Sequence, residues 1–209
     1  MGGAGAARWR AETIGLAGVG RFSSIIEGEM TTIRAAAVDD ADLILEFVRE
    51  LAEYERAPGA VKLTGAELVR DGFPDAGGEC YFEALIAEED GESPHSPNAG
   101  EQAPRREPAG FALFFPVYST WRGRAMHLED LFVRPRFRGR GIGKALLTKV
   151  AALAVERGCV VLYWHVLDWN SPAIEFYKTL GAEPLEEWRR MRVTDEALVA
   201  LAAASAVEA

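Results

Sequence analysis

The chain has 209 residues, of which 49% are hydrophobic and 26% are charged, and both fractions are ordinary for a globular protein. They exclude wholesale disorder, collagen and a disulfide-stapled small protein, and they favour one sizeable domain. The 32 acidic and 23 basic residues give a formal charge of −9, which disfavours nucleic-acid binding and suits a cationic substrate.

Residues 1–29 differ in composition from the rest of the chain. They are rich in glycine and alanine and lack the long apolar stretch of a secretory signal, while three early arginines leave an organelle transit peptide as the alternative. Met30 begins a clear strand. We therefore predict a poorly ordered extension over 1–29 and a single domain over 30–209.

An amphipathic helix follows the first strand. Asp39 or Asp40 is predicted to cap it, and its apolar face consists of Leu43, Ile44, Phe47, Val48 and Leu51. A capping box at Thr64 and Glu67 begins a second, shorter helix. Residues 89–109, rich in proline, glycine, serine and charge, are predicted to form a flexible hairpin insertion. Strands are predicted over 81–87, 110–118 and 126–133.

The second half of the chain alternates helices and strands. The near-continuous apolar run over 159–166 is typical of a buried central strand. Gly158 is placed to end the helix before this strand. The complete order is β-α-α-β-β-β-α-β-α-β-α, which indicates one mixed α/β layer. The predicted elements are helix 143–157, strand 159–166, helix 171–181, strand 188–193 and a terminal helix after 194.

The cysteines and histidines bear on compartment and metal binding. Cys80 and Cys159 each lie beside apolar or aromatic residues, which predicts buried free thiols, with a disulfide as the alternative. Free thiols indicate a reducing compartment, so we expect a cytoplasmic protein. His95, His127 and His165 are scattered without metal-ligand spacing, and no metal is expected. No apolar run reaches the length of a membrane span.

A basic turn with three glycines, VRPRFRGRGIGK at 133–144, joins a predicted strand to a helix N-terminus. The glycines let the backbone approach a ligand, and the N–H groups and dipole at the helix start favour an anion. Arg138, Arg140 and Lys144 add positive charge. We therefore predict a pyrophosphate-binding site at this turn.

Two common phosphate-binding loops do not fit this turn. A nucleotide P-loop requires Gly-x-x-x-x-Gly-Lys-Ser/Thr, whereas here the glycines alternate and Ala145 follows the lysine. The dinucleotide fingerprint requires a further glycine downstream and a place after the first strand. A plain strand-to-helix turn remains an alternative, as does a nucleic-acid contact through the arginines and Phe137.

The segment RGRGIG at 138–143 resembles the Arg/Gln-x-x-Gly-x-Gly/Ala signature of the GNAT acetyltransferases. The segments at 51–57, 118–143 and 166–182 are similar to the diamine (spermidine/spermine) and thialysine N-acetyltransferase branch, and the resemblance covers 30–200. It implies the GNAT fold, an α/β fold in which helices flank a mixed, mostly antiparallel sheet with splayed central strands. It further implies acetyl-CoA as donor, a small primary amine as acceptor, and a homodimer.

The resemblance assigns three segments to acetyl-CoA. The backbone of Leu131, Phe132 and Val133 would pair with the pantetheine arm, and one of its N–H groups would hold the thioester oxygen. A second contact to that arm would come from Asn170, Ser171, Pro172 and Ala173. The diphosphate would be held by Arg138, Gly139, Arg140, Gly141, Ile142, Gly143 and Lys144.

Acetyl transfer to an alkylammonium requires its deprotonation. A lysine-like amine with a pKa of about 10.4 is neutral in roughly one molecule in 2,500 at pH 7, a penalty of ~4.6 kcal/mol. The resemblance places Glu129 at this amine, as the group that takes its proton, and Tyr177 as the acid that protonates the leaving thiolate. The alternatives are an exposed strand carboxylate and a core tyrosine. Asp130, adjacent in the strand, is expected to point to the opposite face, so the two acids should not share a role.

The resemblance also suggests how the acceptor is recognised. Tyr54 and Glu55 match positions that line the amine channel of the family, and Tyr163, Trp164 and His165 lie near its substrate contacts. Glu187, or Glu186, would close the site, although the chain is shorter there than the family pattern. Transfer would be direct, in a ternary complex. The rival functions are a protein or peptide N-acetyltransferase and a non-catalytic acyl-CoA-binding module.

Overall fold

The computed structural model describes residues 22–26, 29–75, 77–90 and 106–204. Most of the predicted N-terminal extension and of the predicted hairpin insertion therefore lies outside the described residues. The chain divides into two compact units, Met1–His165 and Val166–Ala209, and each is described by itself.

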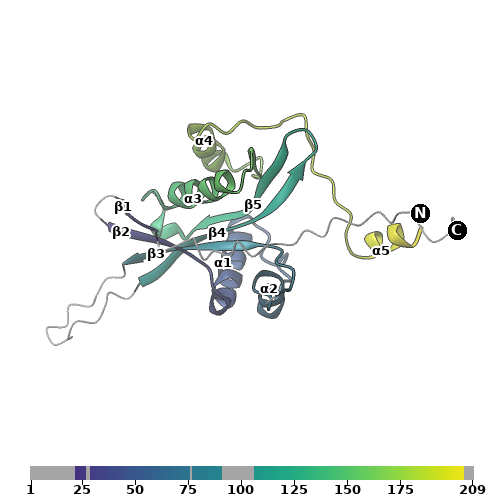
Figure 1. The fold of residues 1–209 in the computed structure, drawn as a ribbon, viewed down its shortest axis with the longest axis horizontal. Helices are drawn as coiled ribbons and strands as arrows, with labels where there is room; N and C mark the ends of the chain where they lie inside the picture. The colour runs from purple at the N-terminus through teal and green to yellow at the C-terminus, as the bar shows by residue number, and fades with distance from the viewer. Residues whose placement is uncertain (1–21, 27–28, 76, 91–105, 205–209) are drawn as a thin grey trace. The chain divides into compact units, whose positions relative to one another are not determined.

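The first unit contains a six-stranded sheet whose strands lie in chain order (Figure 1). Neighbouring strands from β1 to β5 are antiparallel, and β6 pairs with β5 in parallel. The bounds are β1 Phe22–Ile26, β2 Glu29–Ala35, β3 Glu83–Asp90, β4 Arg106–Ser119, β5 Gly123–Val133 and β6 Val161–Trp164.

Two features of these strands differ from what the sequence indicated. Phe22–Ile26 lies inside the predicted extension, yet it pairs with β2 and thereby provides partners for backbone groups that an edge strand would otherwise expose. Residues 159–166 were predicted to form a buried central strand, but β6 is a four-residue, half-buried strand at the edge of the described sheet. A short apolar run does not by itself distinguish a central strand from an edge strand.

The helices of this unit lie on both faces of the sheet. Figure 1 shows α1 (Ala41–Tyr54) and α2 (Gly65–Gly72) on one face and α3 (Ile142–Glu156) on the other. The predicted apolar face of α1 is confirmed: Phe47 is fully buried and its ring stacks on Phe111 of β4, with centroids 5.2 Å apart. One face of α3 is also buried, with Leu146, Leu147, Val150, Leu153 and Ala154. Two short 3-10 helices, Val38–Asp40 and Pro135–Phe137, precede α1 and α3.

The predicted N-cap of α2 is confirmed, whereas that of α1 is not. Thr64 and Glu67 form the expected capping box, in which the Glu67 N–H donates to the Thr64 hydroxyl at 3.3 Å and the Thr64 N–H donates to the Glu67 carboxylate at 2.9 Å. Asp40 occupies the N-cap position of α1 but makes no side-chain cap. Its carboxylate instead accepts from Arg34 and from the Ala37 N–H.

In the second unit the structure describes two helices, α4 (Ser171–Thr179) and α5 (Asp195–Ala204). The prediction of a strand over 188–193 is wrong, because these residues form neither strand nor helix. The described residues of this unit contain no strand, so residues 188–193 have no strand within the unit with which to pair. Both cysteines are free, as predicted, but Cys80 is exposed and Cys159 only half-buried.

Arg134 joins the end of β5 to α1. Its guanidinium lies 4.6 Å from the centroid of the Phe47 ring and donates to Glu46 at 2.5 Å, Glu50 at 2.7 Å and the Pro108 carbonyl at 3.1 Å. This arginine therefore fixes the start of the basic turn against the helix that covers the sheet.

Replacing this arginine tests whether the link stabilises the fold. We expect Arg134→Ala to lower the free energy of unfolding in urea by about 2 kcal/mol, because it leaves two carboxylates and a carbonyl without their donor. The matched control is Arg70→Ala, which removes an exposed ion pair with Asp71 and should lower the free energy of unfolding much less. Equal losses in the two variants would contradict this role of Arg134.

Candidate active site at the end of strand β5

Strand β5 contains a β-bulge at Glu129. The register pairs Phe114 with Leu128 and Leu113 with Asp130, so that Glu129 is an extra residue without a direct partner on β4. Leu113 belongs to the core beneath α1, and Asp130 opposite it therefore lies on the α1 face of the sheet. The expectation that Asp130 points to the face opposite Glu129 is wrong, because the bulge interrupts the alternation on which it rested.

Three carboxylates interact at this bulge. Burial, followed by the negative charges of Glu129 and Glu55, raises the pKa of Asp130 to about 7. Partial burial also raises the pKa of Glu55, at the end of α1. Such a cluster favours a bound cation, which would relieve the repulsion among the acids. Asp130 was not predicted, since nothing in the local sequence marks the bulge.

The face with these acids also carries aromatic rings. His127 pairs with Phe115 of β4, which packs against the core beneath α1, and their ring centroids are 5.1 Å apart. Tyr163 of β6 pairs with His127, so it lies on this face, whereas Trp164 pairs with Leu128 and lies on the other. Of these two predicted substrate residues, only Tyr163 therefore shares the face of the acids.

Arg138 is exposed, yet its side chain contacts other parts of the protein. Its Nε donates to the Val133 carbonyl at 2.8 Å, and its guanidinium lies 4.7 Å from the centroid of the Tyr54 ring. Arg138, which is predicted to bind phosphate, thus connects the basic turn to Tyr54, which is predicted to contact the substrate. Its backbone is part of the turn, and its role in binding phosphate stays a prediction.

The basic turn has the backbone that its glycines require. Gly139 and Gly141 both have φ of +79°, and Gly141 is the N-cap of α3. A Cβ added at Gly139 would meet no atom within 4 Å, so space is open beside the backbone there. In the first turn of α3, the N–H groups of Ile142, Gly143 and Lys144 have no acceptor within the helix. These features fit a diphosphate.

Strands β5 and β6 separate where the donor arm was predicted. Their pairing runs from Ala125 with Val161 to Leu128 with Trp164, whereas β5 continues to Val133. Residues 131–133 therefore lie beyond the described pairing with β6. Their backbone groups on that side can bind an extended ligand as a further strand would.

The remaining predicted residues lie in the second unit. Asn170 is the N-cap of α4, ahead of Ser171, Pro172 and Ala173. Tyr177 is half-buried within α4, with its ring centroid 5.3 Å from that of Phe176, and Glu187 is exposed. The roles assigned to these residues stay predictions.

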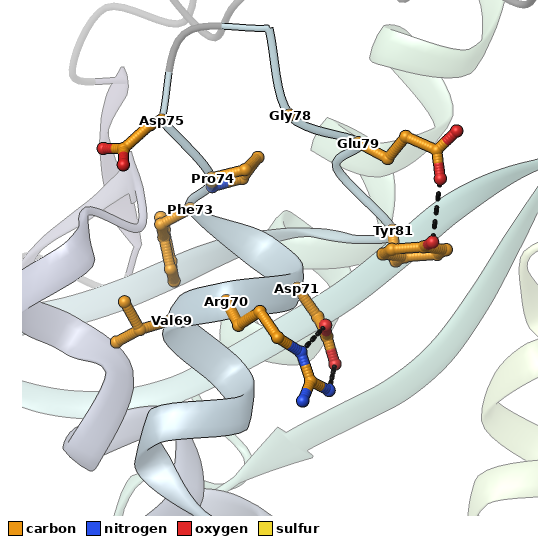
Figure 2. Close-up of a pocket in the computed structure, with 9 residues that line it drawn as sticks. All are labelled: Val69, Arg70, Asp71, Phe73, Pro74, Asp75, Gly78, Glu79 and Tyr81. Atoms are coloured by element: carbon orange, nitrogen blue, oxygen red, sulfur yellow. Dashed lines mark hydrogen bonds and ion pairs between the residues drawn. The ribbon is translucent and has the colours of Figure 1, made fainter.

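A separate surface pocket lies at the C-terminal end of α2 (Figure 2). Arg70 pairs with Asp71 at 2.6 Å, and the Tyr81 hydroxyl donates to Glu79 at 2.8 Å. None of the nine lining residues was predicted as a site residue, and the polar side chains of the pocket pair with one another.

Within the described ranges, no group of three His, Cys, Asp or Glu side chains is placed to hold a metal ion, and no helix is long and apolar enough to cross a membrane.

Comparison with known proteins gives consistent matches. The model of the acetyltransferase (GNAT) family matches residues 63–182. A thialysine N-epsilon-acetyltransferase of Sus scrofa is 41% identical over 81% of this chain and 96% of its own. The spermidine/spermine N(1)-acetyltransferase-like protein 1 of Homo sapiens is 33% identical over 81% of this chain and 23% of its own. Among solved structures, an integron cassette protein from the mobile metagenome of V. cholerae has a TM-score of 0.60 at 24% identity, covering 82% of this chain and 97% of its own.

The raised pKa of Asp130 makes stability depend on pH. Below its ordinary value of 3.8, both the folded and the unfolded state hold the proton; between there and about pH 7 only the folded state keeps it. The folded state therefore loses stability as the pH rises through this range. We expect Asp130→Asn to be stabilised relative to the unmodified chain at pH 8 but not at pH 4, by on the order of 2–4 kcal/mol in urea unfolding.

The control for this experiment is Asp39→Asn, at an exposed position before α1. Its stability difference from the unmodified chain should not grow between pH 4 and pH 8. If the stability difference between Asp130→Asn and the unmodified chain is likewise the same at pH 4 and pH 8, the carboxylates at the bulge do not interact as described.

Proposed function

Because the chain belongs to the GNAT acetyltransferase family and has its fold, we propose that it transfers the acetyl group of acetyl-CoA to a small amine. The acceptor is the primary amine of a diamine, a polyamine or a lysine-like (thialysine) compound, and transfer is direct, in a ternary complex. The observation that carries this proposal is the carboxylate cluster of Glu55, Glu129 and Asp130 beside the separation of β5 and β6.

The donor is bound by backbone more than by charge. The first-turn amides of α3, which follow the N-cap Gly141, and the open backbone at Gly139 hold the diphosphate, with Arg140 and Lys144 nearby. The arm extends along residues 131–133, where an N–H group can stabilise the charge that develops on the thioester oxygen. This arrangement brings the acetyl group to the end of β5, next to the bulge.

The acceptor binds through its positive charge. The three carboxylates attract an alkylammonium, and Tyr54 at the end of α1 contributes an aromatic wall. Glu129, half-exposed, accepts a proton from the ammonium, and the neutral amine then attacks the thioester. The penalty of ~4.6 kcal/mol for free deprotonation at pH 7 is thereby reduced, since the proton passes to an adjacent carboxylate.

Tyr177 completes the reaction in this proposal. Its phenol donates a proton to the departing thiolate, and Asn170, the N-cap of α4, contacts the arm of the donor, as the family resemblance implies. The proposal includes a cytoplasmic homodimer without nucleic-acid or membrane partners. The free thiols, the net charge of −9 and the resemblance to the diamine branch support these points.

Removing the charge of Glu129 tests the acceptor site. In a thiol-release assay with diamines, polyamines and thialysine, we expect the unmodified chain to be active. Glu129→Gln should lower kcat/KM by roughly 100-fold or more, because the proton acceptor is lost. Calorimetric affinity for acetyl-CoA should be unchanged. The control Glu53→Gln alters an exposed acid on α1 and should keep normal rates.

The outcomes separate the competing functions. Activity on peptides but on none of the small amines would favour a protein or peptide N-acetyltransferase. Tight binding of acetyl-CoA without transfer to any amine would favour a non-catalytic acyl-CoA-binding module.

Tyr177→Phe tests the thiolate acid. We expect turnover to fall by roughly 100-fold or more while acetyl-CoA affinity stays within about twofold, because only the acidic hydroxyl is removed. Tyr81→Phe, at an exposed tyrosine of the first unit, serves as the control. Near-normal turnover of Tyr177→Phe would exclude this tyrosine from the chemistry.

A further inference from the structure

His127 lies between an acid of the proposed site and a second histidine. Its Nε2 is 3.2 Å from the Glu129 carboxylate, and its ring centroid is 5.1 Å from that of His165. We propose that His127 and His165 form a relay that carries the proton of the acceptor amine from Glu129 to solvent. This inference rests on the proposed function and adds two residues to it: His127, which acts through Glu129, and His165, which acts through His127.

The fold places the three side chains on one face of the sheet. His127 and Glu129 flank the start of the bulge on β5, and their contact shows that both point toward α1's side, where Phe115 packs. Tyr163 pairs with His127 across β5 and β6, and His165 lies two residues further along. Residues two apart in an extended strand share a face, which agrees with the ring contact between the two histidines.

Burial gives the relay a direction. The His127 side chain is only 12% exposed, the Glu129 side chain is 40% exposed, and His165 is exposed. An ammonium must approach Glu129 from the exposed part of the carboxylate, because His127 occupies the other part. Once the amine covers that open side, the proton leaves Glu129 through His127, whose second neighbour, His165, reaches solvent.

The proton balance requires no further reactant. An N–H bond of the ammonium breaks as an O–H bond forms on Glu129, and that bond breaks as Nε2–H forms on His127. His127 then releases the proton on its other nitrogen toward His165, and His165 releases its own proton to water. The two imidazoles change tautomer and return by rotation or exchange with water. Imidazole suits this task because its charge changes between pH 5 and 8.

The charged groups around His127 bias this transfer. Glu129 contacts His127 directly, and Asp130, whose carboxyl senses the charges of Glu129 and Glu55, follows it on β5. Tyr163 of β6 pairs with His127, and the His165 ring lies beside it. A bound ammonium neutralises part of this carboxylate charge, so that the proton accepted by His127 moves on toward His165.

Rescue by free imidazole distinguishes a relay from a structural role. We expect His127→Ala to lower kcat by about tenfold or more at pH 7 and added imidazole to restore much of the loss, because the small base can occupy the vacated position. His165→Ala should show a smaller loss that buffer bases restore. The matched control is Phe115→Leu, which disturbs the packing of the same ring without removing a proton carrier. Imidazole should not restore that variant.

A conservative variant keeps the test informative if the alanine variant folds poorly. His127→Gln retains a polar side chain in the same place but cannot transfer a proton, and it should show the same loss of kcat with little change in KM. Normal kcat in His127→Gln and His165→Ala, or a loss in His127→Ala that imidazole does not restore, would overturn the relay alone. Absence of acetyl transfer by the unmodified chain to every amine would instead overturn the proposed function and the relay with it.

Discussion

The extra residue in β5 is the constraint on which the candidate site depends. Without it, Asp130 would lie on the face covered by α3, and the carboxylates of β5 would be divided between the two sides of the sheet. With it, Glu129 and Asp130 interact with each other and with Glu55 at the end of α1. Pairing with β6 ends one residue earlier, at Leu128, so the acids lie where the backbone of β5 becomes available to a ligand.

Local signals predicted the helices and the basic turn well. The capping box at Thr64, the buried face of α3 and the positive φ at Gly139 and Gly141 each follow from a few neighbouring residues. Pairing between strands could not be predicted in this way. The bulge depends on the register between β4 and β5, and the edge position of β6 depends on which strands find partners. Asp130 was therefore missed, although Glu129 beside it was identified from a resemblance.

Arg138 illustrates a second limit of motif-based prediction. As part of a basic, glycine-rich signature it was expected to bind phosphate, and its place in the turn is as predicted. Its side chain instead connects the Val133 carbonyl to the ring of Tyr54. A motif specifies the backbone that its glycines need, whereas the direction of a long, flexible side chain depends on neighbours distant in sequence. For Arg138 those neighbours are Val133 at the end of β5 and Tyr54 at the end of α1.

In the basic turn, glycine is required by the conformation of the backbone rather than by a lack of space for a side chain. Gly139 and Gly141 both adopt a left-handed backbone, and Gly139 has no neighbour within 4 Å that an added methyl group would touch. An L-alanine at Gly139 would cost roughly 1–2 kcal/mol through backbone strain alone. A D-alanine, whose preferred torsions are the mirror image, would match this position. Chirality, not volume, thus restricts what the chain can carry at Gly139, and a chemically synthesised protein with a mirror-image residue there could keep the bend intact.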